Sequence, residues 1–136
     1  MILGIGTDLT DIRRVEKTLA RYGEQFENRV FTAREQKKAK SRKNAGKKTV
    51  ASTYAKRFAA KEACAKALGT GFRGGIGWHD IEIVTAGNGY PSLMLHGAAR
   101  ARLKAITPKG MTAKLHLSIS DEPPFAVAMV VIEATA

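Results

Sequence analysis

The chain has 136 residues, of which 44% are hydrophobic, and this is enough for one domain spanning residues 1–136 with a modest core. Its 23 Lys and Arg outnumber its 12 Asp and Glu, so the formal net charge is +11 and the natural partners are anions: nucleic acid, phosphates, an acidic protein or a membrane surface. One cysteine excludes an internal disulfide framework and a CxxC metal site. With no membrane-length apolar stretch and no signal-peptide pattern, the sequence predicts a cytoplasmic protein.

Residues 1–10 alternate in polarity and predict a strand. Gly4 and Gly6 share one face of this strand with Asp8, and glycines leave a strand face bare where another backbone or a ligand approaches closely. Two interpretations of Asp8 remain open, a ligand-binding carboxylate and a residue of an ordinary strand-to-helix corner. For Asp11, we favour the cap of the next helix.

Residues 11–22 predict an amphipathic helix that ends at Gly23. The inward stripe consists of Ile12, Val15, Leu19 and Tyr22. The outward face is basic and carries Arg13, Arg14, Lys17 and Arg21. A solvated run of charges is the default interpretation of this face. Because Glu16 is the only acidic residue set against these four cations, the face is also a credible docking surface for an acidic helix.

Residues 32–35 predict the start of a further helix, with Thr32 as its cap and Glu35 closing a capping box. From Gln36 to Lys61 there are ten Lys or Arg and no acid. The segment from Lys37 to Lys48, which includes Asn44 and Gly46, predicts a loop. Few aromatic residues interleave with these cations, which weakens an interpretation as a single-strand nucleic-acid surface.

Residues 50–68 predict a helix, in which Glu62 lies on the apolar side near Phe58. A carboxylate there needs a cation, a metal ion or strong hydrogen-bond donors. Lys66, one turn later, is the simplest partner, and taken alone the pair is an ordinary helix ion pair. Gly69 ends the helix and opens the run GTGFRGGIG, which is not a P-loop and is either a flexible connection or a wrap around a phosphate.

The last part of the chain predicts a hairpin of strands 80–86 and 92–96, a basic helix over 97–106, and strands 114–120 and 125–132. The last strand is almost wholly apolar, so we expect it to be buried on both faces. The strand before it places His116, Ser118 and Ser120 on one polar face. A Ser/His/Asp hydrolase using Ser118, His116 and Asp121 is disfavoured because two of these residues are neighbours on one strand face and no GxSxG motif is present. A zinc site is disfavoured because the three histidines have no ligand spacing.

Asp8 and Glu62 remain as two carboxylates in a strongly basic chain. Without cysteine or histidine ligands beside them, they suit a hard divalent ion such as Mg²⁺, which completes its coordination with water and substrate phosphates. Phosphoryl-type transfer is then the natural class of reaction.

Three blocks of sequence carry a resemblance to a known family: GIGTDLTDIRR at 4–14, RFAAKEACAKALGTG at 57–71 and HLSISD at 116–121. In this order they resemble the bacterial holo-[acyl-carrier-protein] synthases, the small type of phosphopantetheinyl transferase, and the central block matches the family pattern F-x-x-K-E-x-x-x-K. The resemblance implies an α+β fold, in which a small, mostly antiparallel sheet packs against a long central helix and shorter helices. The segment 37–53 is not typical of the family, so no residue roles are carried into it.

The resemblance implies that coenzyme A binds as its Mg²⁺ complex, with the metal held by Asp8 and Glu62. A serine of an apo acyl carrier protein then attacks the phosphorus next to pantetheine, adenosine bisphosphate leaves, and Lys66 neutralises the growing charge. The general base is open between a metal-bound water, Asp8 and Glu35. This reaction serves fatty acid biosynthesis.

The resemblance also implies a homotrimer with active sites between subunits, so that Asp8 and Glu62 face His116, Asn88 and Gly89 of a neighbour across the bare glycine face. The residues implied to bind coenzyme A are Arg57, Lys61, Gly69, Asn88, Gly89, Pro91, His116 and Ser118. The acidic carrier protein would dock on Arg13, Arg14, Lys17 and Arg21.

Two alternatives differ in class from this reaction. A non-catalytic, basic nucleic-acid-binding protein accounts for the charge but leaves Asp8 and Glu62 unexplained. A catalytically inactive relative that acts as an interaction module is disfavoured because both carboxylates and Lys66 are present. We expect no membrane and no specific nucleic acid among the partners.

Overall fold

The computed structural model describes residues 1–41 and 46–136 of the chain. A three-stranded antiparallel sheet has the order β1-β5-β4, formed by β1 (Ile2–Asp11), β4 (Thr112–Glu122) and β5 (Phe125–Thr135). A separate antiparallel hairpin consists of β2 (Ile81–Thr85) and β3 (Pro91–Leu95). The predicted α+β class and the predicted hairpin are therefore confirmed.

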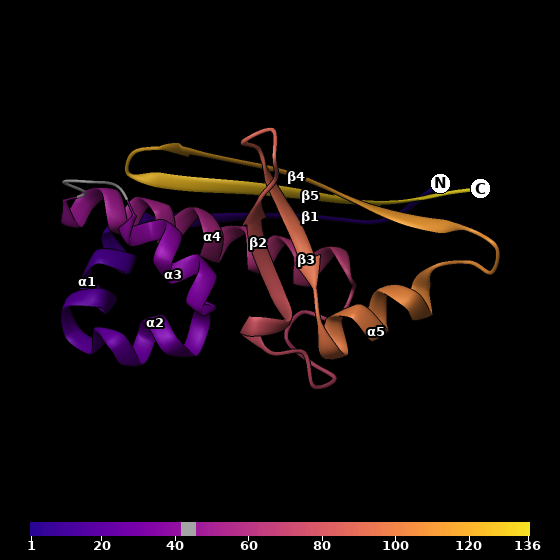
Figure 1. Cartoon of the computed structure of the whole chain (residues 1–136), viewed down its shortest axis with the longest axis horizontal. Coiled ribbons are helices and arrows are strands. Elements are labelled where there is room, and N and C mark those ends of the chain that lie inside the picture. Colours follow the sequence, from indigo (N-terminus) through magenta and orange to yellow (C-terminus); the bar gives the residue numbers. More distant parts are fainter. Residues whose placement is uncertain (42–45) are drawn as a thin grey trace.

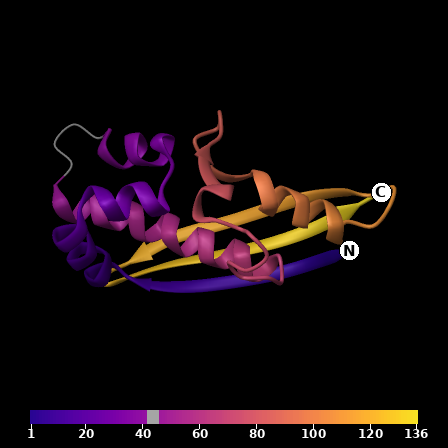
Figure 2. The same cartoon turned by 90° about the horizontal axis from the view of Figure 1, so that it is seen from below.

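The helices lie on one side of the three-stranded sheet (Figures 1 and 2). They are α1 (Ile12–Tyr22), α2 (Glu24–Val30), α3 (Ala33–Lys40), α4 (Lys47–Ala67) and α5 (Gly97–Ile106), with a 3₁₀ turn at Trp78–Asp80. Helix α4 runs along the sheet, α1 to α3 gather at its first half, and α5 lies near its other end (Figure 1). The predicted central helix is confirmed and begins at Lys47, before the predicted start. In the part of the chain that the structure describes, no helix is long and apolar enough to cross a membrane.

Two glycines bring β1 and α4 into backbone contact. A Cβ on Gly4 would lie 1.9 Å from the carbonyl oxygen of Ala67, and a Cβ on Gly6 would lie 1.9 Å from that of Ala63. Any side chain at these positions would therefore force the strand and the helix apart. The bare face beside Asp8 is thus covered by α4 of the same chain, which corrects the expectation that a neighbouring subunit covers it.

The other face of the three-stranded sheet is open in the single chain. On β1, Ile5 and Leu9 are 64% and 62% exposed, and on β5 Met129 is 49% exposed. The expectation that residues 125–132 are buried on both faces is therefore wrong for one chain. Strand β5 alternates, with Ala126, Ala128, Val130, Ile132 and Ala134 buried beneath the sheet. The apolar outer face remains available to another molecule.

Two further expectations are corrected. The segment between the two helices is shorter than the predicted loop from Lys37 to Lys48, because α3 continues to Lys40 and α4 begins at Lys47. Asn44, which was part of that prediction, belongs to residues 42–45, which lie outside the described residues. The predicted inward stripe of α1 is confirmed for Ile12 and Val15, but Tyr22 is 48% exposed.

The predicted caps are confirmed. The Asp11 side chain accepts the backbone N–H of Arg13 at the start of α1, and Thr32 and Glu35 form both hydrogen bonds of a capping box at the start of α3.

Candidate active site

Asp8 and Glu62 face one cavity. It has a volume of about 300 Å³ and lies between β1, α1, α2 and α4, where both carboxylates and Arg14 contribute to its wall. Asp8 reaches this cavity because the glycine contacts press β1 onto α4, and Glu62 reaches it from the half-buried side of that helix. Two carboxylates that are 54 residues apart in the sequence (Asp8 and Glu62) are therefore neighbours in the fold.

Lys66 contacts the same cluster. Its Nζ lies 3.1 Å from Oδ1 of Asp8 and donates to the carbonyl oxygen of Thr7 at 3.0 Å. The second oxygen of Asp8 accepts the hydroxyl of Thr10 at 3.1 Å. Lys66 therefore pairs with Asp8, and the simplest expectation from the sequence, a Glu62–Lys66 helix pair, is replaced by an ion pair between strand and helix.

The electrostatics of Glu62 favour a cation. Burial raises the pKa of Glu62, the negative charge of Asp8 raises it further, and Lys66 opposes both effects. A divalent ion between the two carboxylates would remove this repulsion, and Mg²⁺ needs only one or two protein carboxylates when water and phosphate complete its shell. The donor set thus fits Mg²⁺, whereas no group of three or more His, Cys, Asp or Glu that could hold a metal occurs among the described residues.

A second cavity gathers several residues expected to bind coenzyme A. It has a volume of about 440 Å³, and its wall includes Arg57 of α4, Gly89 of the hairpin turn and Pro91 at the start of β3. Asn88 belongs to the same turn, where its side chain accepts the backbone N–H of Tyr90. Arg57 and Glu62 are five positions apart on α4, which separates their directions by about 140°. The two cavities therefore open on different sides of the helix.

His116 and Ser118 lie on the open face of β4. Asp8 of β1 pairs with Ala128 of β5, and Ser118 of β4 pairs with Met129 of β5, so strand β5 lies between Asp8 and Ser118. Asp8 also lies on the face of the sheet that the helices cover. Nε2 of His116 lies 3.1 Å from Glu133, and Asp121 accepts the hydroxyl of Ser52 at 2.8 Å. A triad of Ser118, His116 and Asp121 is thus absent, and His116 does not reach Asp8 within one chain.

The structure corrects the expected role of Lys61. Its side chain is fully buried, and Nζ donates to the carbonyl oxygens of Trp78 and Ile81 and lies 2.8 Å from Glu35. Burial lowers the pKa of Lys61, and the Glu35 carboxylate opposes that shift. All of its hydrogens have protein acceptors, so Lys61 is not placed to contact a phosphate of the substrate.

Glu35 and Gly69 are also engaged within the chain. Glu35 is fully buried and accepts the backbone N–H groups of Thr32 and Ile83, which removes it from the candidates for a general base. Gly69 has a φ of 81° and ends α4, and its N–H donates to the carbonyl oxygen of Lys66. That N–H is not available to a phosphate.

The basic face of α1 divides in two. Arg13 is tied to Asp11 at 2.8 Å, and this contact lowers the pKa of Asp11 to about 2. Arg14 lines the cavity of Asp8 and Glu62, whereas Lys17 and Arg21 are exposed farther along the helix. Of the four cations expected to act together, Arg13 is therefore engaged with Asp11 and Arg14 borders the cavity of the two carboxylates.

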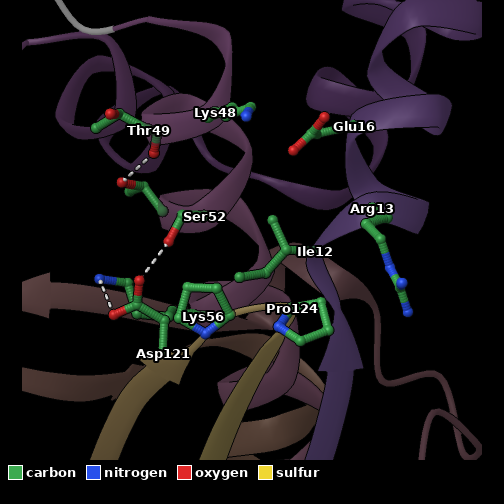
Figure 3. A pocket seen from close by; sticks show the side chains of 11 residues that line it. Ile12, Arg13, Glu16, Lys48, Thr49, Ser52, Lys56, Asp121 and Pro124 are labelled. Carbon is green, nitrogen blue, oxygen red and sulfur yellow. Dashed lines mark hydrogen bonds and ion pairs between the residues drawn. The ribbon is translucent and has the colours of Figure 1, made fainter.

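A larger cavity than that of Asp8 and Glu62 lies elsewhere. It has a volume of about 930 Å³ between the start of α1, the start of α4 and the turn after β4. There Ser52 and Lys56 both contact Asp121, at 2.8 and 3.6 Å (Figure 3). Neither Asp8 nor Glu62 lines it, so cavity size alone does not identify the site.

Sequence reasoning also missed Lys38 and Lys56, which line the cavity of Arg57 and gave no signal beyond their charge.

Comparison with known proteins identifies the family of this chain. The family model of the 4′-phosphopantetheinyl transferase superfamily matches residues 4–121. The chain belongs to this superfamily of enzymes, and within it to the holo-[acyl-carrier-protein] synthases. This membership confirms the resemblance on which the site residues were chosen and disfavours a non-catalytic nucleic-acid-binding protein.

Relatives cover almost the whole chain. A holo-[acyl-carrier-protein] synthase of Rhodopseudomonas palustris (strain HaA2) is 56% identical over 98% of this chain and 94% of the relative, and one of Cereibacter sphaeroides (strain ATCC 17029 / ATH 2.4.9) is 57% identical with the same coverage. Among solved structures, the Bacillus anthracis synthase in complex with CoA (3′,5′-ADP) has a TM-score of 0.76 and 36% identity, with 99% of each chain covered. The Plasmodium yoelii synthase with ADP bound has a TM-score of 0.81 and 32% identity, with 100% of this chain and 97% of that chain covered.

Proposed function

We propose that this enzyme transfers the phosphopantetheine group of coenzyme A to a serine of an apo acyl carrier protein, with Mg²⁺, and releases adenosine bisphosphate. The observation that carries the proposal is the pair of carboxylates, Asp8 and Glu62, that face one cavity beside Lys66 in a member of this family. We further propose that the enzyme acts in the cytoplasm and serves fatty acid biosynthesis.

In the proposed reaction the serine oxygen forms a bond to the phosphorus next to pantetheine, while the bond from that phosphorus to the oxygen of adenosine bisphosphate breaks. A Mg²⁺ ion held by Asp8 and Glu62 would supply Lewis-acid stabilisation of the negative charge on the phosphate oxygens. Lys66 lies at the same cluster and adds a second positive charge. Asp8 is the side chain we propose to accept the serine proton, since Glu35 is buried and engaged.

We propose that the complete site forms between subunits of a homotrimer. Asp8 and Glu62 would supply the metal half from one subunit, and Arg57 with the turn at Asn88 and Gly89 would supply the nucleotide half from the next. His116 and Ser118, on the open face of β4, would belong to the nucleotide half. The exposed apolar residues of that sheet face support an assembly through it, because such a face costs free energy in water.

Mass spectrometry tests the reaction directly. An apo acyl carrier protein incubated with this enzyme, coenzyme A and Mg²⁺ should gain the mass of one phosphopantetheine, and the gain should disappear when EDTA replaces Mg²⁺. Nucleotide analysis of the same mixture should find one adenosine bisphosphate for each modified carrier. If apo acyl carrier proteins from several species all stay unmodified with metal present, the proposed function is contradicted.

The exposed part of the basic face of α1 is proposed to dock the acidic carrier. Because Arg13 is tied to Asp11 and Arg14 lines the cavity, the informative variant is Lys17→Glu with Arg21→Glu. Reversing these charges should raise KM for the carrier about tenfold and leave KM for coenzyme A unchanged. The matched control is Lys104→Glu with Lys109→Glu, which reverses two exposed charges on and after α5. Equal changes in both Michaelis constants would contradict docking at this face.

A further inference from the structure

The carboxylate of Asp8 is held at both of its oxygens by side chains of the same chain. Oδ1 lies 3.1 Å from Nζ of Lys66, and Oδ2 accepts the hydroxyl of Thr10 at 3.1 Å. The torsion about the Cβ–Cγ bond of an aspartate is broad, so the rotamer of Asp8 alone does not fix the plane of its two oxygens. Two contacts on opposite oxygens do fix that plane.

The two contacts differ in how firmly they are held. The side chain of Lys66 is 52% exposed and carries its charge at the end of a flexible four-carbon stem. Thr10 is only 9% exposed, and its β-branched side chain is stiff about χ1. The backbone of Thr10 is also fixed, because β1 pairs it with Ala126 of β5. Thr10 is therefore the rigid contact of Asp8, and Lys66 is the adjustable one.

The hydroxyl of Thr10 is not explained by packing. Gly6, Asp8 and Thr10 alternate along the face of β1 that the helices cover. Valine has the same shape as threonine and also favours strands, so a covered strand position does not by itself require a hydroxyl. A buried hydroxyl without a partner costs free energy, and the carboxylate of Asp8 is the partner that removes this cost. The contact to Asp8 accounts for a threonine at this position.

The proposed reaction affects the two contacts differently, and this step rests on the proposed function. Lys66 would meet the negative charge of the phosphate oxygens, which competes with its contact to Asp8. The hydroxyl of Thr10 has a single proton, and that proton is already directed at Asp8. Thr10 therefore keeps the carboxylate in place while Lys66 turns to the substrate.

We propose that Thr10 is a positioning residue for the metal half of the site. Its hydroxyl holds the carboxylate of Asp8 in one orientation before a divalent cation binds, so that this ligand needs no reordering on binding. Groups that orient a metal ligand in this way commonly contribute about 10- to 100-fold to metal affinity or activity. Thr10 lines the same cavity as Asp8 and Glu62. The sequence assigned no role to this residue.

Binding of Mn²⁺, a paramagnetic substitute for Mg²⁺, tests the proposal without the transfer reaction. Electron paramagnetic resonance of the free ion gives the Kd of the enzyme with coenzyme A present, after subtraction of binding to coenzyme A alone. Thr10→Val keeps the shape of the side chain but removes its hydroxyl, and it should raise the Kd roughly 10- to 100-fold. Thr10→Ser keeps the hydroxyl and should bind Mn²⁺ as the wild type does. The matched control is Thr107→Val, which removes a hydroxyl that donates to the carbonyl oxygen of Leu103 and should leave the Kd unchanged.

A second comparison holds even if the valine variant is unstable. Thr10→Ser and Thr10→Ala both lack the methyl group and differ only in the hydroxyl, so a purely structural role of the methyl group would give them equal Kd values. In transfer kinetics, Thr10→Val should need more Mg²⁺ for half-maximal rate, with a smaller change in kcat at saturating Mg²⁺. A Kd for Mn²⁺ that is unchanged in both Thr10→Val and Thr10→Ala would overturn the proposal.

The binding measurement also separates this inference from the proposed function. Mn²⁺ binding that depends on the hydroxyl of Thr10, in an enzyme that modifies no carrier, would support the positioning role and contradict the reaction. Transfer activity in an enzyme whose metal binding does not depend on that hydroxyl would contradict the positioning role alone.

Discussion

Replacing Glu62 with glutamine should lower kcat by about a thousandfold or more in the presence of Mg²⁺ and leave the fold intact. The change removes a metal-binding charge but almost no volume, and the loss of one preorganised charge-stabilising group commonly costs two to three orders of magnitude in rate. Transfer kinetics monitored by carrier mass measure this effect. A rate within threefold of the wild type would remove Glu62 from the site.

The stability of the same variant distinguishes lost chemistry from lost structure. Because the pKa of Glu62 is raised in the folded chain, its ionised form is destabilised by burial and by Asp8. The folded state therefore binds more protons than the unfolded state. The destabilisation of the folded state by ionised Glu62 is fully present above the pKa that Glu62 has in the folded chain, and it disappears below the pKa that Glu62 has in the unfolded chain. Without metal at pH 7, Glu62→Gln should have a Tm equal to or higher than that of the wild type. Added Mg²⁺ should increase the stabilisation by coenzyme A in the wild type and should not increase it in the variant.

Mixing two inactive chains tests the shared site. An Arg57→Ala chain keeps the proposed metal half, and a Glu62→Gln chain keeps the proposed nucleotide half. After subunit exchange at equal amounts, about a quarter of the interfaces in a cyclic trimer should join two intact halves, and activity should return. The absence of recovery in trimers confirmed to be mixed would contradict a site divided in this way.

Replacing Lys61 with methionine should lower the free energy of unfolding by about 3–5 kcal/mol, because the Glu35 carboxylate would remain buried without its cation. For a domain of this size, that corresponds to a decrease in Tm of about 10–20 °C. Thermal unfolding followed by circular dichroism measures it. A phosphate-binding role would give the opposite pattern, with a raised KM for coenzyme A and an unchanged Tm.

The double variant Lys61→Met with Glu35→Gln provides the control. It removes the buried charge together with its partner, although a glutamine accepts only one of the two backbone N–H groups that Glu35 now accepts. The double variant should therefore be more stable than Lys61→Met alone, with a coupling of at least about 1 kcal/mol. Additive effects would contradict the buried ion pair.

Local patterns in the sequence determined most of the elements. Alternation predicted β1 and β4, the capping box predicted the start of α3, and helix-forming composition predicted α4, because each of these signals acts over a few neighbouring residues. Prediction from the sequence failed where the local signal for a helix was weak. The lysine-rich stretch after Glu35 was predicted as a loop, but α3 continues to Lys40, whose ion pair with Glu27 at 2.7 Å is a long-range contact.

The residues by themselves also drew attention to Asp8 and Glu62, since a carboxylate on an apolar helix face and one on a glycine-flanked strand are chemically conspicuous, and the family resemblance added a catalytic role for Lys66. Only the tertiary structure decided which cations are available. Lys61 and Arg57 look alike in the sequence, but Lys61 is buried against Glu35 and two carbonyl oxygens. Arg57 instead lines a cavity, and its buried Nε has no hydrogen-bond partner among residues 1–41 and 46–136. Charge pairing depends on contacts between distant segments, and no local pattern encodes which acid a given lysine will meet.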